Sequence, residues 1–276
     1  MRKIPCTSDF EIDLFALDKE IKQDREKGLH PFVIIGTAGA VNMGAIDDLE
    51  ALADIATKEK LWFHVDGAFG ATAVISKTVG HRLSGLSRVD SLAFDFHKWL
   101  QVNYDAGCVL IKNKENHRKS FSDRPAYLRS AERGLAGGAF WAVDYGPELS
   151  RGFRALKVWA HLKEHGLNAL ATVIDRNIEQ AQFLKSLIEN EPQLEMLAPV
   201  PLNICCFRYK PTNLDSDQLN EEIVVQLQEQ GIAVPSTTII NGQLAIRANF
   251  TNHRTRNEDL RFLVENVVRI GNEFDK

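Results

Sequence analysis

The 276-residue sequence lacks a hydrophobic segment that could cross a membrane. It has no run of about 18 uncharged apolar residues, the length that a spanning helix needs. The first residues, MRKIPCTSDFEID, also lack the apolar core of a secretory signal peptide. These absences exclude a membrane as partner and predict a cytoplasmic protein.

The sequence also lacks a dense block of positive charge. Its 33 lysines and arginines are outnumbered by 37 aspartates and glutamates, so the net charge is −4 and the isoelectric point lies near 6.1. A protein of this charge has no electrostatic reason to bind nucleic acid or anionic lipid. Small-molecule chemistry is therefore the favoured class of function.

Cysteine is scarce, and the four that occur show no CxxC spacing. Cys205 and Cys206 are adjacent in an apolar segment typical of a strand, so we expect their side chains on opposite faces. We expect all four cysteines to be buried reduced thiols, namely Cys6, Cys108, Cys205 and Cys206.

The first part of the sequence alternates between helical and strand patterns. One helix is predicted over 14–27, capped by Asp13 and ended by Gly28, and a second is predicted to begin at Asp47 or Asp48. Strands with few polar side chains are predicted at 32–35, 61–67, 91–96 and 106–113. This alternation predicts an α/β fold whose sheet is covered by helices on both faces.

The periodic pattern is interrupted in the middle of the chain. Residues 118–147 show no sustained periodicity and have the length of a loop that often carries function. Two long helices are then predicted over 151–190, divided at Gly166. We expect residues 1–190 to form a partial large domain that includes this loop.

The C-terminal part predicts a compact α+β unit over 191–276. Its pattern indicates a strand at 203–209, a helix from about Ser216, a hairpin that turns at Asn241-Gly242 and a terminal helix from Asn257. We expect this unit to be a small domain appended to the first.

Two predicted strands end in side chains that are unusual after an apolar segment. Asp66 closes LWFHVD and precedes the small residues Gly67 and Ala68, whereas His97 and Lys98 follow SLAFDF. Because open α/β sheets bind ligands outside the carboxyl ends of their strands, we expect these groups at one edge. There an amine could form a Schiff base with a carbonyl cofactor, and a carboxylate could keep a pyridine nitrogen protonated.

Each of these residues also has a simpler interpretation. An aspartate that closes a strand is most often a turn or helix cap, and a lysine after a strand is most often a solvated side chain. His64 and Asp66 share a face of one predicted strand and could ligate a metal ion. Two ligands without a third at suitable spacing are a weak indication, so we predict no metal.

Five segments occur in the order TAGAVNMGAIDDLEALADIA, LWFHVDGAFGA, SLAFDFHKWLQVNYDAGCVLIKN, SRGFRALKVW and LAIRANFTNHRT. Together they resemble the group II pyridoxal-phosphate-dependent amino-acid decarboxylases, which include the aromatic-amino-acid, glutamate, histidine and cysteine-sulfinate decarboxylases. The resemblance extends from about Pro31 to the C-terminus. It implies a fold-type I, transferase-like fold, pyridoxal 5′-phosphate as cofactor and decarboxylation of an L-amino acid, with an aromatic amino acid as one candidate substrate.

The resemblance also implies roles for residues around the cofactor. Lys98 corresponds to the lysine that forms the Schiff base, and His97 to a contact of the phosphate. Asp66 corresponds to the partner of the pyridine nitrogen, and Ala68 to a residue that packs on the ring.

Two further residues correspond to positions that act on the substrate. Arg247 would hold the substrate carboxylate, although it could equally be an exposed strand arginine. Tyr127 would lie on a mobile catalytic loop that reaches a neighbouring subunit's site and protonates the carbanionic intermediate, which implies a homodimer. Alternatively, Tyr127 is an aromatic residue that only anchors the loop.

One departure from the family pattern is an absence. Residues 1–30 contain no glycine-rich loop that could bind phosphate, and His30 is wrongly placed to stack on the cofactor ring. The chain resembles the C-terminal portion of a decarboxylase, so we expect impaired activity unless an N-terminal chain complements it. The alternatives are an inactive fragment, an interaction partner of a full-length homologue, or another fold-type I enzyme such as an aminotransferase or aldolase.

Overall fold

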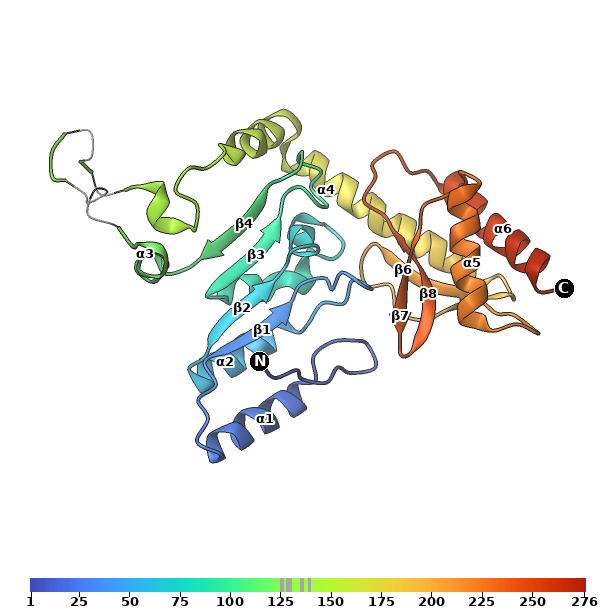
Figure 1. Ribbon diagram of the computed structural model, residues 1–276, viewed down its shortest axis with the longest axis horizontal. Coiled ribbons are helices and arrows are strands. Elements are labelled where there is room, and N and C mark those ends of the chain that lie inside the picture. The colour runs from blue at the N-terminus through green and yellow to red at the C-terminus, as the bar shows by residue number, and fades with distance from the viewer. Residues whose placement is uncertain (125–126, 128–130, 135–136, 139) are drawn as a thin grey trace.

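The computed structural model describes residues 1–124, 127, 131–134, 137–138 and 140–276, which form two sheets connected by a long helix (Figure 1). The first sheet has the order β1-β2-β3-β4, formed by β1 (Val33–Thr37), β2 (Trp62–Asp66), β3 (Ser91–Asp95) and β4 (Gly107–Ile111). The first three strands are parallel, and β4 is antiparallel to β3. All four strands lie where the apolar pattern predicted them.

The helices before β1 and β2 begin at the predicted caps. In front of α1 (Leu14–Glu26), the carboxylate of Asp13 accepts hydrogen bonds from the first-turn backbone, and Asp48 does the same for α2 (Leu49–Glu59). Asp47 has a different role, because its carboxylate accepts the backbone N–H groups of Ile12 and Thr37, both at 2.7 Å. It therefore fixes the N-terminal segment to the end of β1.

The helical elements cover one face of the first sheet. Ile34, Phe63 and Val65 are buried there against α1, α2, the short helices η1 (Ala71–Ile75) and η2 (Gly80–Arg88), and the middle of the chain's longest helix. On the opposite face, Ile35 and Val109 are 46% and 47% exposed. The described residues therefore cover this second face less completely than the first. The connections from β1 to β2 and from β2 to β3 pass on the same side, and residues 96–106 join β3 to β4.

The predicted loop contains some regular structure. α3 (Lys114–Phe121) overlaps its start and η4 (Ala142–Tyr145) lies near its end, and residues 125–126, 128–130, 135–136 and 139 are outside the described residues. α4 (Arg154–Glu189) follows, and its backbone leaves the helical conformation at Gly166, where φ is 73°. This break confirms the predicted division. Neither α4 nor any other described helix has the length and apolar composition that crossing a membrane requires.

The second sheet is antiparallel and has the order β5-β6-β8-β7. Its strands are β5 (Leu194–Met196), β6 (Ile204–Tyr209), β7 (Ser236–Ile240) and β8 (Gln243–Asn249). It packs with α5 (Ser216–Glu229), α6 (Asn257–Phe274) and the end of α4, which runs from one unit to the other (Figure 1). The hairpin turns at Asn241 and Gly242 with positive φ at both, as predicted.

The cysteines are all free, but only two are buried. Cys206 belongs to the core beneath the first sheet and Cys205 to the core of the second, which confirms that they point to opposite faces of β6. The prediction was wrong for Cys6, which is exposed in the segment before α1, and for Cys108, which is partly exposed because β4 is an edge strand.

Candidate active site

The structure brings Asp66 and Lys98 to the same edge of the first sheet. β2 and β3 are adjacent and parallel, with Asp66 in register with Ala93. Asp66 ends β2, and Lys98 comes three residues after Asp95, the last residue of β3. Both groups therefore lie at the carboxyl ends of neighbouring strands, the usual position for a ligand site in an open α/β sheet.

Asp66 is exposed and its turn is tightly packed. Its Oδ1 accepts the backbone N–H of Ala68 at 3.1 Å. Gly67 is buried, and a Cβ there would lie 2.3 Å from the Cβ of Ala71. At Gly70 a Cβ would lie 2.6 Å from the carbonyl oxygen of Ala38. The glycines are thus explained by close packing of the backbone, and they do not by themselves indicate a ligand.

Lys98 forms an ion pair that the sequence pattern did not reveal. Its Nζ lies 2.6 Å from Oδ2 of Asp95, and the Lys98 side chain remains 40% exposed. Gly107, opposite on β4, leaves room for this carboxylate, because a Cβ there would lie 3.1 Å from Asp95 Oδ1. The sequence feature that could have indicated this ion pair is the spacing of three residues between Asp95 and Lys98.

His97 has a defined protonation pattern in its neutral form. Its Nδ1 accepts the backbone N–H of Ala106 at 2.9 Å, and its ring packs edge-on against Tyr104 with 4.5 Å between ring centroids. An imidazole whose Nδ1 accepts carries its proton on Nε2. His97 therefore offers one N–H donor to a ligand, which suits an anionic oxygen.

Two buried aromatic rings join the turn that carries Asp66 to the turn that carries Lys98. Phe69 and Trp99 stack with 5.4 Å between centroids and an angle of 6° between planes. Both rings belong to the core, with Phe69 6% and Trp99 1% exposed. The stack fixes the separation of the two turns, because buried rings of this size cannot move without opening the core.

Arg247 on β8 reaches the same edge from the second unit. Its Nε donates to the carbonyl oxygens of Val41 and Asn42, its Nη2 to Val41, and its Nη1 to Ser236 Oγ at 3.3 Å. Val41 and Asn42 belong to the loop after β1, which begins beside Asp66 because the Ala38 N–H donates to the Asp66 carbonyl.

The charge of Arg247 has no acidic partner among the described residues. Burial lowers the pKa of Arg247 below its usual range. Of the five N–H donors of a guanidinium, three are occupied, which leaves two. A partly buried cation with two free donors at fixed positions is suited to binding a carboxylate.

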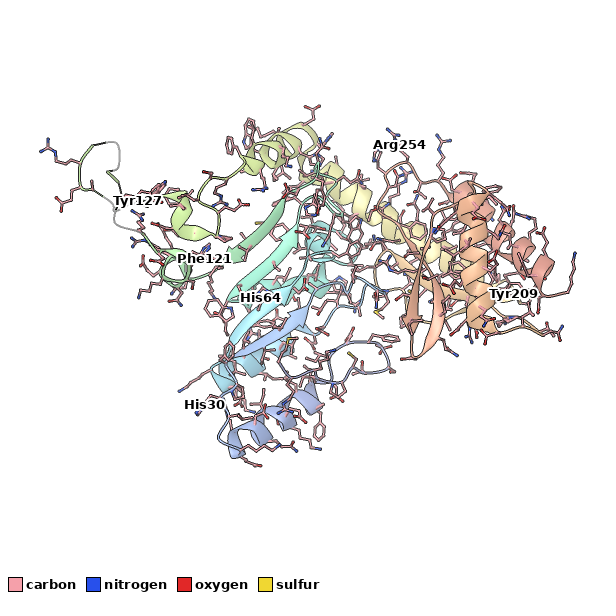
Figure 2. All side chains as sticks on the ribbon, in the orientation of Figure 1. His30, His64, Phe121, Tyr127, Tyr209 and Arg254 are labelled. Atoms are coloured by element: carbon pink, nitrogen blue, oxygen red, sulfur yellow. The ribbon has the colours of Figure 1, made fainter. Side chains whose placement is uncertain are left out.

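Tyr127 lies far from Lys98 within one chain. β4 ends opposite the start of β3, because Ile111 pairs with Ser91, and α3 and Tyr127 follow from that end. Figure 2 places Tyr127 beyond α3, on the side of the sheet away from the second unit. Tyr127 is 79% exposed and borders a cavity with Phe121. It cannot act at Lys98 of its own chain in this conformation.

His64, labelled in Figure 2, is hydrogen-bonded within the first sheet. Its Nδ1 lies 2.7 Å from Ser91 Oγ, which also accepts the indole N–H of Trp62 at 2.7 Å. Within the described ranges, no group of three or more histidine, cysteine or acidic side chains could hold a metal ion.

Comparison with known proteins identifies the family. The model for the pyridoxal-dependent decarboxylase conserved domain matches residues 1–210. The chain belongs to the pyridoxal-dependent decarboxylase family. It is 37% identical to an aromatic-L-amino-acid decarboxylase of Bacillus atrophaeus over 98% of this chain and 57% of that protein. Human histidine decarboxylase is 31% identical over 94% of this chain and 38% of its own length.

The same family is evident among solved structures. The structure of Oryza sativa TDC with PLP and tryptamine superposes with a TM-score of 0.91 at 26% identity, covering all of this chain and 58% of that one. The chain thus has the fold of these enzymes, as the sequence predicted, and it spans a little over half the length of that structure and of the Bacillus relative.

The residues at the edge of the sheet fit pyridoxal phosphate. The exposed Asp66 carboxylate has no cationic partner among the described residues and could accept a pyridinium N–H. The Lys98 amine is partly exposed, and His97 Nε2 can donate to a phosphate oxygen. These donors and acceptors match the aldehyde, the ring nitrogen and the phosphate of that cofactor.

Proposed function

We propose that this chain carries the lysine side of a pyridoxal-phosphate site that decarboxylates an L-amino acid, with an aromatic amino acid as the first candidate. The observation that carries the proposal is the delivery of Asp66 and Lys98 to one edge of the sheet by adjacent parallel strands. The 37% identity to a relative named as an aromatic-L-amino-acid decarboxylase supports the substrate class.

In this proposal each residue performs one task. Pyridoxal phosphate, when bound, supplies the electron sink that accepts the electron pair left by departing carbon dioxide. The amine of Lys98, when it is not paired with Asp95, would hold the aldehyde end of the cofactor. The carboxylate of Asp66 would accept the ring N–H and keep the nitrogen cationic, Ala68 would pack on the ring, and His97 Nε2 would donate to the phosphate.

Arg247 and Tyr127 act on the substrate. The two free N–H groups of Arg247 bind the α-carboxylate before the reaction. Tyr127 donates its hydroxyl proton to the substrate carbon in the site of a second subunit, since it lies at the far end of the sheet from Lys98 of its own chain. This assignment implies a homodimer.

An N-terminal chain that completes the site is the second kind of partner. The open face of the first sheet, with Ile35 and Val109 about half exposed, supports such a partner. Apolar side chains grouped on one sheet face favour a covering protein surface.

The proposal is tested first by trapping the cofactor. Purified protein is mixed with pyridoxal phosphate, reduced with borohydride and digested, and we expect the added mass on the peptide that contains Lys98. Lys98→Ala should abolish the label, whereas Lys77→Ala, which changes an exposed lysine elsewhere, should retain it. Equal labelling of all lysines would contradict the proposal.

Turnover is tested next with aromatic L-amino acids. Carbon dioxide release without keto-acid formation supports decarboxylation, and keto-acid release would favour an aminotransferase. Mixing Lys98→Ala and Tyr127→Phe chains should restore activity if the tyrosine acts in the partner's site. Sedimentation velocity should give a dimer.

A noncatalytic role is the second candidate function. The partly exposed apolar side chains of Ile35 and Val109 on one face of the first sheet favour it, because they offer a surface to a protein partner. In that case Lys98→Ala retains the biological effect of the chain on a full-length homologue, and the trapping experiment leaves Lys98 unlabelled.

A further inference from the structure

A buried row of hydrogen-bonded side chains starts at Trp99, the residue after Lys98. The indole Nε1 of Trp99 donates to Oδ1 of Asn177 over 3.1 Å, and Nδ2 of Asn177 donates to Oε1 of Gln180 over 3.2 Å. Nε2 of Gln180 then donates to the carbonyl oxygen of Thr255 over 2.6 Å. The row connects the turn with Lys98, through α4, to the segment between β8 and α6.

The direction of each hydrogen bond is fixed by the two ends of the row. An indole N–H can only donate, and a backbone carbonyl can only accept. Asn177 must therefore turn its oxygen to Trp99 and its amide nitrogen to Gln180. Neither amide can flip without breaking two bonds, so the row has one orientation.

The burial of the row indicates a role beyond stability. Trp99, Asn177 and Gln180 are 1%, 0% and 3% exposed. A buried hydrogen-bonded pair adds little net stability compared with an apolar pair of the same shape, because both partners lose their hydration. A fully paired buried row does, however, fix side chains in one arrangement.

The arrangement that it fixes is the turn around Lys98. Trp99 is held on one side by Phe69 and on the other by Asn177. Gln101, at the end of the turn, donates to the carbonyl of Thr251 at 2.8 Å. On the other side of Lys98, His97 Nδ1 accepts the backbone N–H of Ala106 at 2.9 Å, so Lys98 lies between two anchored residues, His97 and Trp99.

We propose that Asn177 is a positioning residue that holds Trp99 and thereby keeps Lys98 against Asp95 and at a fixed distance from Asp66. This inference rests on the proposed function in one respect, namely that the Lys98 amine binds the cofactor. Without Asn177, Trp99 keeps its stack on Phe69 but is no longer held from the side of α4. The Lys98 amine then leaves Asp95 more often.

The test measures the reactivity of Lys98 without any cofactor. Asn177→Leu and wild type are methylated with trace formaldehyde and cyanoborohydride, and the rate at each lysine is read by peptide mass relative to the exposed Lys77 and Lys112. We expect the relative rate at Lys98 to rise about threefold, the factor that an ordinary partly exposed ion pair contributes. Asp95→Asn, which removes the partner, sets the largest rise attainable.

The control is Asn220→Leu, which removes another fully buried helical asparagine, one that bonds the backbone of Tyr209 in the second unit. It should lower the stability of the protein by a similar amount and leave the methylation rate of Lys98 unchanged. Equal acceleration in both variants, or no change at Lys98 in folded Asn177→Leu, overturns the proposal. If Asn177→Leu fails to fold, we use the double variant Asn177→Leu/Gln180→Leu, in which both amides are removed. The same methylation rates then support or overturn the proposal.

Cofactor trapping provides a separate readout. If wild type is labelled by pyridoxal phosphate at Lys98, the rate of labelling should fall in Asn177→Leu and not in Asn220→Leu, because a cofactor held by Asp66 needs the amine at a fixed distance, whereas free formaldehyde needs only an unpaired amine. An equal rate in both variants overturns the positioning role. If wild type is not labelled, the proposed function fails, and the methylation rates alone decide on Asn177.

Discussion

Cys206 can report whether the loop after β1 is held against the second unit. Its Sγ donates to the carbonyl oxygen of Asn42 at 3.3 Å, and the Arg247 guanidinium donates to the same oxygen at 3.0 Å. Burial raises the pKa of Cys206 to about 11, although the nearby charge of Arg247 opposes the shift. The thiol is only 1% exposed, so it should react when this contact opens.

The expected rate follows from the fraction of thiolate, the form that reacts. At pH 8 a thiol of pKa about 11 is about one part in a thousand ionised, whereas an ordinary thiol of pKa about 8.5 is about one quarter ionised. Cys206 should therefore react with iodoacetamide about 200-fold more slowly than an exposed thiol, and burial slows it further. Peptide mass distinguishes it from the exposed Cys6, which serves as the internal reference.

Arg247→Met is the perturbation that tests the contact. The change removes charged hydrogen bonds to the carbonyls of Val41 and Asn42, each worth about 1.5 kcal/mol or more, so local opening should increase at least about tenfold. The loss of the positive charge acts the other way, because it raises the pKa of Cys206 further. We expect the opening to prevail and the labelling of Cys206 to accelerate. Arg208→Met, which removes a β6 arginine paired with Glu195, should have no such effect.

Two results would refute this reasoning. One is labelling of Cys206 as fast as Cys6 in the wild-type protein, which would mean that the thiol is not protected. The other is equal labelling of Cys206 in Arg247→Met and Arg208→Met, which would mean that Arg247 does not hold the loop.

Three further predictions concern stability, measured by urea unfolding. Leu202→Ala should lower the free energy of unfolding by about 3 kcal/mol, since this fully buried side chain packs on the loop after β1; a loss below about 1 kcal/mol contradicts that packing. Gly70→Ala should cost about 2 kcal/mol because its Cβ would overlap the Ala38 carbonyl. Burial alone would raise the pKa of Asp175, but hydrogen bonds that include one from Ser76 Oγ outweigh it and lower the pKa. This stabilisation is present above the usual pKa of about 3.9 and is lost as the pH falls through the lower folded value, so the cost of Asp175→Asn, about 1 kcal/mol at pH 7, should decrease steadily as the pH falls below about 3.9.

Local features of the fold could be predicted from the sequence. The caps at Asp13 and Asp48, the break at Gly166 and the turn at Asn241-Gly242 each depend on the chemistry of one or two neighbouring residues. The positions of Asp66 and Lys98 could also be predicted, because parallel strands place their ends at one edge.

Contacts between distant residues could not be predicted in this way. Arg247 and Val41 are 206 residues apart, and Trp99 and Asn177 are 78 apart. Periodicity marks Asn177 only as a position on a helix, and nothing local distinguishes a buried amide from an exposed one. The exposure of Cys6 was missed for the same reason, since burial depends on the packing of the whole chain.

The distance between Asp66 and Lys98 is set on the covered face of the first sheet. Phe69 and Trp99 lie in the same core cluster as α2 and α4, and neither ring faces the open side that carries Ile35. A partner on the open side would bury apolar surface and alter association, but it would not replace the stacked rings. The distance between the Lys98 amine and the Asp66 carboxylate is therefore set by the stacked rings of the core. The association of the chain with a partner has a different physical origin, the apolar surface on the open side.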